Sequence, residues 1–277
     1  MIQSMLLAID MSPSAKVATR YATDLSRKLE GGVHAVHVVD ARLTQAGFYG
    51  EIVRPDVIAS DIKRRQETEQ HLERQGDSLL ASVKDEIEAA GVKCRVERLN
   101  GVPAVRLLEA AVDSDLIVMG RRGESAELDD TKGLGEVVER VLRTAEQPVL
   151  LAGSEFEDVT RILLGFDGSG PARAAMVYAI ELAQRLSLPV MAISVHSDDD
   201  MARRHLDTVE HYAASHKVRL ESGHRKGDPA DVILGMAQPG DLITIGAFGH
   251  GRIREWLLGS TTEAILRSVQ QPVLLHR

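Results

Sequence analysis

Glycines follow an apolar run at two places in this 277-residue chain, and their spacing is the feature most suggestive of a binding chemistry. In the second half, Gly246 and Gly249 are followed, after nine residues, by Gly259 and Ser260. Glycine allows positive φ and close backbone approach, so that successive N–H groups can turn toward an anion. A helix that begins after Gly259 would add its dipole and its free amides. This set predicts a phosphate-binding loop, although glycine in such a turn also serves purely conformational needs.

The first half repeats the spacing with one difference. Gly120 and Gly123 are followed, after nine residues, by Gly133, but the next residue is Leu134 and not a hydroxyl residue. A hydrogen bond to a charged group contributes roughly 1.5 to 3 kcal/mol. The missing hydroxyl therefore predicts binding about ten-fold to a hundred-fold weaker in the first half.

The charge of the two loops favours the second half in the same way. Between its second and third glycines the first half has four acidic residues and one lysine, a net charge of -3. The same stretch of the second half has two arginines and one glutamate, a net charge of +1 with histidine neutral. The pair Arg121 and Arg122 is able to offset part of the acidic loop. We expect a phosphate group to prefer the second half.

The elements that must position these loops occur twice. Residues 5–10 match residues 162–167 at a separation of 157 positions, and residues 115–120 match residues 241–246 at a separation of 126. The difference predicts about 31 extra residues in the first copy, after residue 40. Duplication preserves sequence whether or not it is used, so the repeated spacing adds little to the case for phosphate binding.

Each copy alternates short β-branched runs with amphipathic stretches, which is the pattern of a mostly parallel sheet covered by helices. The predicted fold class is α/β, with two tandem doubly wound, mostly parallel five-stranded, Rossmann-like domains at residues 1–153 and 159–277. The residues between them form a short linker. Strands are predicted at residues 4–10, 33–39, 93–98, 115–119 and 148–152, and again at 161–167, 189–195, 217–222, 241–245 and 272–276.

The extra segment of the first copy has two features. Residues 61–75 carry mixed charges that fit the solvated face of a long helix, with a partner-binding surface as the alternative. Before them, Phe48 and Tyr49 stand among glycines in a chain that is only 3% aromatic. These two aromatic side chains predict a lid or a contact patch.

Composition excludes several classes of protein. The net charge of -8 argues against nucleic-acid binding. Cys94 is the only cysteine, which rules out an intramolecular disulfide and a cysteine-based zinc site and fits a cytoplasmic location. No apolar run approaches the roughly 20 residues of a membrane span, and the N-terminal run lacks the basic flank of a signal peptide. The histidine spacing does not favour a metal site.

Taken together, these features resemble the universal stress proteins. The resemblance includes the glycine spacing, Asp10 and Asp167 after the first strand of each copy, the Gly-x-Pro pairs, and the closing segments after Pro148 and Pro272. It implies an adenine nucleotide alpha hydrolase-like fold in its tandem form, with the two domains packed as a pseudo-dimer through their final strands. It also implies that the chain binds ATP, as some members do, whereas others bind no nucleotide.

Carried over by position, the resemblance implies two sets of contacts to ATP, with Mg²⁺ neutralising the phosphates of the bound nucleotide. The set in the second copy is Asp167, Val195, Gly246, Gly249, Gly259, Ser260 and Thr261. The weaker set in the first copy is Asp10, Val38, Gly120, Gly123 and Gly133. For the two aspartates, turn formation or helix capping is the alternative.

Catalytic patterns are absent from the sequence. We find no nucleophile–base pair, no Walker A motif, and no dinucleotide fingerprint at the first strand. The expectation is a cytoplasmic, ATP-dependent regulator of the stress response with at most weak ATP hydrolysis. A nucleotide-free protein-interaction role and a slow ATPase are the alternatives, and a homodimer is left open.

Overall fold

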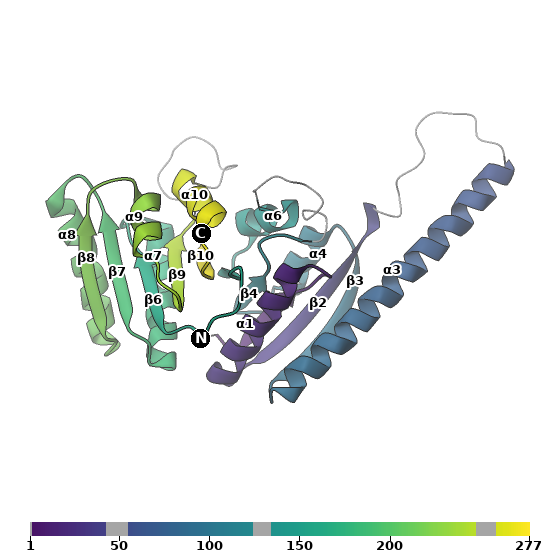
Figure 1. The fold of residues 1–277 in the computed structure, drawn as a ribbon, viewed down its shortest axis with the longest axis horizontal. Coiled ribbons are helices and arrows are strands. Elements are labelled where there is room, and N and C mark those ends of the chain that lie inside the picture. The colour runs from purple at the N-terminus through teal and green to yellow at the C-terminus, as the bar shows by residue number, and fades with distance from the viewer. Residues whose placement is uncertain (1, 43–54, 124–133, 248–258) are drawn as a thin grey trace.

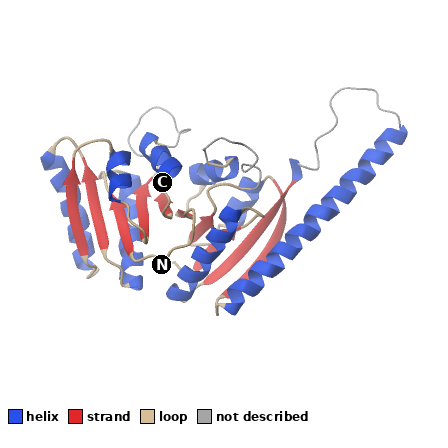
Figure 2. Ribbon diagram, in the orientation of Figure 1, coloured by secondary structure: helices blue, strands red, loops and turns tan. Residues whose placement is uncertain are grey.

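A single sheet runs through the whole molecule in the computed structural model, which describes residues 2–42, 55–123, 134–247 and 259–277. The sheet has ten strands in the order β3-β2-β1-β4-β5-β10-β9-β6-β7-β8. Helices cover both of its faces (Figures 1 and 2). The predicted doubly wound, mostly parallel α/β class is confirmed, with the five strands of each copy joined to those of the other.

The elements of copy one (residues 1–153) are β1 (Ser4–Ala8), α1 (Pro13–Leu29), β2 (Gly32–Asp40), α3 (Pro55–Ala89), β3 (Lys93–Gly101), α4 (Pro103–Ala110), β4 (Leu116–Met119), α6 (Glu136–Thr144) and β5 (Val149–Leu151). The elements of copy two (residues 159–277) are β6 (Arg161–Gly165), α7 (Gly170–Leu186), β7 (Val190–Val195), α8 (Asp199–Ser215), β8 (Leu220–Arg225), α9 (Pro229–Met236), β9 (Asp241–Gly246), α10 (Ser260–Ser268) and β10 (Val273–His276). Both copies follow the same order of elements.

The two copies meet where β5 and β10 pair antiparallel, whereas the other strand pairs of the sheet are parallel. Val149, Leu150 and Leu151 lie opposite Leu275, Leu274 and Val273. All six are buried, so this short ladder lies in the interior and closes the two central edges of the half-sheets.

Alternation along the strands divides the core into two layers. One apolar cluster joins the sheet to α1, α3, α7 and α8, and includes Leu7, Tyr21 and Ile162. The other joins the opposite face to α4, α6, α9 and α10, and includes Leu6 and Ile117. Successive side chains of a strand point to opposite faces, which is why Leu6 and Leu7 belong to different layers.

The first helix of each copy begins in the same way. Ser12 caps α1 by accepting from the Ala15 N–H (3.1 Å), and Ser169 caps α7 by accepting from the Ala172 N–H (3.2 Å). Both helices have 17 residues and end at a residue with positive φ. Serine at the N-cap satisfies an amide that the helix itself leaves unpaired.

The extra residues of copy one lengthen one helix. Helix α3 has 35 residues, whereas α8 has 17. Figure 1 shows α3 crossing the outer end of the sheet and continuing beyond the strands. Residues 63–71 are exposed except for the half-buried Arg65. The sequence predicts one solvated face of the helix here, but the structure exposes almost all sides of residues 63–71, because this part of α3 continues beyond the strands. Phe48 and Tyr49 lie outside the described residues.

One strand is shifted from its predicted place. The sequence predicts a strand at 217–222, but β8 spans Leu220–Arg225. Lys217 has φ 56 and its N–H donates to the Ala214 carbonyl, so the turn that ends α8 takes the first of these residues. Among the described helices, none has the length and hydropathy of a membrane span.

Candidate functional site

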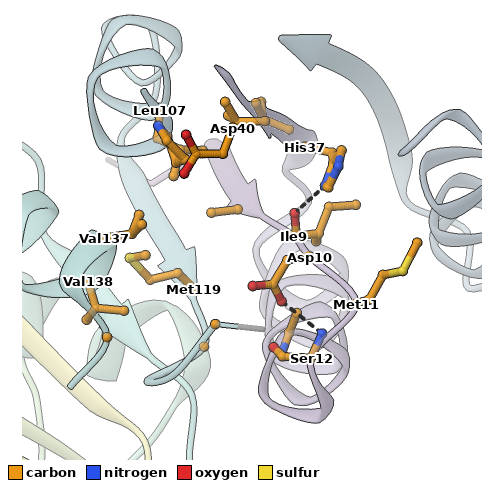
Figure 3. A pocket seen from close by; sticks show the side chains of 18 of the residues that line it. Ile9, Asp10, Met11, Ser12, His37, Asp40, Leu107, Met119, Val137 and Val138 are labelled. Carbon is orange, nitrogen blue, oxygen red and sulfur yellow. Dashed lines mark hydrogen bonds between the residues drawn. The ribbon is translucent and has the colours of Figure 1, made fainter. Parts of the chain in front are cut away.

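A cavity of about 240 Å³ lies in copy one, at the carboxyl ends of β1, β2 and β4 (Figure 3). Four of the predicted residues line it: Asp10, Val38, Gly120 and Gly123. Strand β1 lies between β2 and β4, so the chain order reverses at this point of the sheet. Ligands of open α/β sheets bind at such reversals, outside the carboxyl ends of the strands.

The two aspartates that follow the first strands have a turn-forming role. The Ser12 N–H donates to Asp10 Oδ1 (3.0 Å), and the Ser169 N–H donates to Asp167 Oδ1 (2.9 Å). Each bond closes a side-chain turn that leads into the N-cap serine. Asp10 also lines the cavity, so turn formation and ligand contact are compatible for this residue.

Two of the predicted glycines are needed for packing. A Cβ on Gly120 would lie 2.3 Å from Ser14 Oγ and 2.9 Å from the Ser14 carbonyl carbon. A Cβ on Gly246 would lie 2.4 Å from the Ala172 backbone nitrogen. In both copies the fourth strand ends against the first turn of the helix that follows the first strand. Close packing therefore requires glycine at these two positions whether or not a ligand binds.

The structure corrects the correspondence between the third glycines of the two copies. Helix α6 has Gly135 as its N-cap and α10 has Gly259, and each helix has nine residues. The counterpart of Gly259 is thus Gly135 and not Gly133, because the loop of copy one is two residues longer. Glu136 takes the place of Ser260, which the sequence comparison had given to Leu134. Gly133 and Gly249 lie outside the described residues.

The remaining residues of the copy-two set lie at strand ends and at the start of α10. Asp167 follows β6, Gly246 ends the adjacent strand β9, and Val195 ends β7. Ser260 is exposed in the first turn of α10, and Thr261 beside it is half-buried. The N-cap residues Gly135 and Gly259 are glycines and have no side chain. The first amides of α6 and α10 therefore receive no hydrogen bond from an N-cap side chain.

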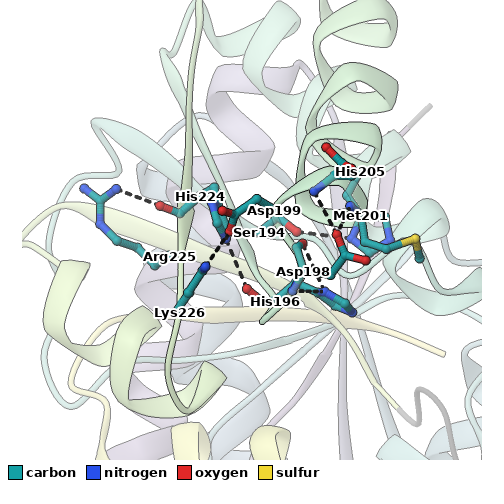
Figure 4. A network of polar contacts seen from close by, with 10 residues as sticks. Ser194, His196, Asp198, Asp199, Met201, His205, His224, Arg225 and Lys226 are labelled. Atoms are coloured by element: carbon teal, nitrogen blue, oxygen red, sulfur yellow. Dashed lines mark hydrogen bonds and ion pairs between the residues drawn. The ribbon is translucent and has the colours of Figure 1, made fainter.

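Histidines lie near the strand ends of copy two: His196 follows β7, His224 lies in β8, and His205 lies on α8 (Figure 4). His205 Nδ1 lies 3.2 Å from Ser194 Oγ, and the His205 ring packs edge-on against Phe166 and His196. A Cβ on Gly168 would lie 2.7 Å from this ring. Sequence reasoning missed this contact, because the spacing of the α8 histidines was compared only along the helix. Within the described parts of the chain, no group of three or more metal-ligating side chains is placed to hold a metal ion.

An ion-pair network lies at the cavity of copy one. The Arg42 guanidinium donates to both carboxylate oxygens of Asp40 (2.7 and 3.0 Å) and to Glu136 (3.1 and 3.2 Å). All three residues line the cavity. Burial acts to raise the pKa of Asp40, but the hydrogen bonds from Arg42 outweigh it and hold that pKa below its usual value. Sequence reasoning missed these residues, although Asp40 does stand at the end of a predicted strand.

The two arginines after Gly120, Arg121 and Arg122, have different contacts. The buried guanidinium of Arg121 donates to the backbone carbonyls of Val269 and Gln271 in copy two. Burial lowers its pKa to about 10. Arg122, in contrast, lines the cavity. Arg121 therefore ties the glycine loop of copy one to the end of α10, and of the pair it is Arg122 that lines the cavity.

The fold and the internal repeat agree with comparisons to known proteins. The model of the universal stress protein family matches residues 1–153 and again residues 159–277. The chain belongs to this family. A universal stress protein of Synechocystis sp., Slr1230, is 28% identical over the full length of both chains.

A solved structure of the family extends the comparison of the fold. A universal stress protein from Archaeoglobus fulgidus covers 99% of this chain and 98% of its own, with a TM-score of 0.77 and 24% identity. A universal stress protein crystallised in complex with cAMP covers 54% of this chain and 96% of its own, with a TM-score of 0.37 and 20% identity.

Proposed function

We propose that the chain binds an adenine nucleotide and acts as a ligand-dependent regulator of the stress response. The observation that carries this proposal is the copy-one cavity, which brings together Asp10, Val38, Gly120 and Gly123 at the reversal point of the half-sheet. These residues are far apart in the sequence and were selected by family resemblance, independently of the cavity. Its mixed lining, with apolar side chains and a few polar groups, is typical of small-molecule sites.

For ATP, copy two remains the proposed site. Ser260 stands at the first position of α10, where its hydroxyl and the helix amides are able to meet a phosphate. The same position in copy one holds Glu136, whose carboxylate repels an anion. A Mg²⁺ ion bound with the nucleotide would lower its negative charge, and the carboxylates of Asp10 and Asp167 are hard oxygen donors of the kind this ion accepts.

Small molecules released from the purified, denatured chain test the proposal by mass spectrometry. We expect an adenine nucleotide from the wild type, and less of it from Gly123→Ala, in which a Cβ would lie 2.7 Å from Asp10 Oδ2, and from Gly249→Asp. Gly235→Ala is the control, because a Cβ there meets nothing within 4 Å. Absence of nucleotide, together with no ATP binding in calorimetry, would contradict the proposal.

A second candidate is an interaction role for the exposed segment 63–71 of α3. It extends past the sheet and carries charges of both signs, including the ion pair of Lys63 and Glu67 (3.9 Å). Deleting residues 43–71 tests this role. Loss of a bound protein partner, with nucleotide binding unchanged, would favour an interaction role over control by a ligand.

Slow ATP hydrolysis is the other alternative. It would appear as release of phosphate that a substitution of Gly259 abolishes.

A further inference from the structure

The cavity of copy one has an apolar inner part and a charged mouth. Its inner wall is formed by side chains of the strands and of two helices: Ala8, Val36, Leu107, Met119 and Val138. Figure 3 shows Leu107, Met119 and Val138 among the residues that line the space, together with Asp10 and Asp40. Such a wall suits a flat, weakly polar ring system.

The charged groups of the mouth carry more negative than positive charge. Among the described residues, three carboxylates line the cavity, those of Asp10, Asp40 and Glu136, together with the two guanidinium groups of Arg42 and Arg122. Arg42 is already hydrogen-bonded to two of the carboxylates. An added polyphosphate would have to compete with both for this cation.

Glu136 also occupies the end of α6 that would otherwise attract a phosphate. It is the first residue of the helix, where a carboxylate interacts favourably with the helix dipole. In copy two the corresponding residue is Ser260, which has no charge. The two copies therefore differ in charge at the first residue of this helix, which under the proposed function meets the phosphate end of a nucleotide.

We propose that the copy-one cavity selects an adenine ligand of low negative charge, a nucleoside or a nucleoside monophosphate, and that Glu136 excludes the triphosphate. The proposal rests on the proposed adenine-nucleotide function and adds to it a division of labour, in which copy one senses the low-charge ligand and copy two takes ATP. Glu136 is thus a specificity-determining residue.

A probe that reports copy one alone makes the proposal testable in the full chain. The Met119 methyl group belongs to the cavity wall, so NMR of the methionine-methyl-labelled protein follows ligand binding at this site, with Met119→Leu to assign the signal. Adenosine, AMP and ATP are titrated separately, with and without Mg²⁺. We expect the Met119 signal to saturate at concentrations of adenosine or AMP at least about tenfold below that of ATP.

Variants separate charge from shape. Glu136→Gln keeps the size of the side chain, and is expected to tighten ATP binding about tenfold at the Met119 site while changing adenosine binding less than about twofold. The gain should shrink as salt is raised, because Glu136 is exposed. Glu139→Gln on the same helix is the control, since Glu139 pairs with Arg143 (3.1 Å) and does not line the cavity.

Three outcomes would overturn the proposal. One is tighter binding of ATP than of AMP to the wild type at the Met119 site, and another is an equal effect of Glu136→Gln on adenosine and ATP. The third is weaker binding of Mg-ATP by this variant, as expected if Glu136 were a ligand of Mg²⁺. If no adenine ligand shifts the Met119 signal, the proposed function itself fails at this cavity and the division of labour fails with it.

Discussion

Leu150 lies opposite Leu274 in the antiparallel ladder of β5 and β10, and each is the counterpart of the other in the repeat. The local two-fold relation between the copies therefore passes between these two residues. Both are at most 1% exposed. The pair joins the half-sheets and also contributes to one of the two layers of the core, because both residues belong to the cluster under α1 and α7.

Replacing Leu274 by alanine is expected to lower the free energy of unfolding by about 2 to 5 kcal/mol, since it removes buried methyl groups and leaves a cavity at the joint. Urea unfolding followed by circular dichroism measures the change. Val112→Ala is the matched control, because Val112 is 71% exposed and its truncation should cost no more than about 0.5 kcal/mol. Equal effects of the two substitutions on the free energy of unfolding would show that Leu274 in the β5–β10 pairing contributes no more to stability than an exposed side chain.

Gly246→Ala tests the close approach of β9 to α7. The new Cβ would lie 2.4 Å from the Ala172 nitrogen and 2.6 Å from the Pro171 carbonyl carbon, so backbone must move. We expect destabilisation by about 1 to 3 kcal/mol in thermal or urea unfolding. Gly170→Ala should be neutral or slightly stabilising, because a Cβ there meets nothing within 4 Å. A neutral Gly246→Ala would contradict the packing role.

Arg161 and Asp241 form a bidentate ion pair (2.7 and 2.6 Å) at the start of adjacent strands. The Asp241 side chain is 2% exposed, so Arg161→Met leaves a buried carboxylate without its cation. We expect a loss of about 3 kcal/mol in the free energy of unfolding. Arg219→Met is the control, since the pair of Arg219 and Glu221 is exposed and worth little. A loss under about 1 kcal/mol would show that water already compensates Asp241.

The buried His34 predicts a fall in stability at mildly acid pH. Burial lowers its pKa and the nearby Arg95 lowers it further, whereas Glu97 acts in the opposite direction. The unfolded chain, in which histidine has a pKa near 6.5, then binds more protons than the folded chain, so stability decreases as pH falls below about 6.5. The pKa of His276 is also lowered by burial and adds to the same slope.

Unfolding curves at several pH values between about 5 and 8 check this expectation. His34→Gln should reduce the slope of stability against pH below about 6.5, whereas His71→Gln, on the exposed part of α3, should leave it unchanged. A slope that is the same in all three proteins would contradict the assignment to His34.

Local pattern in the sequence determined the elements and their class. Short apolar, β-branched runs located the strands, and Ser12 and Ser169 begin helices as caps, because these features depend on neighbours a few residues away. Self-similarity revealed the repeat and the longer connection in copy one. Asp10, Val38, Gly120 and Gly123 were found through a family pattern, and they do line one cavity.

Only the tertiary structure decided which residues meet. The pairing of Leu150 with Leu274 joins strands that are more than a hundred residues apart, and local pattern carries no register for such a contact. Equal glycine spacing suggested Gly133 as the partner of Gly259, but the helix caps show Gly135, because the length of a loop does not fix where a helix begins. The caps also make Glu136 the counterpart of Ser260, and the fold places Glu136 beside Arg42. The charge that distinguishes the two copies at this position therefore became visible only in the structure.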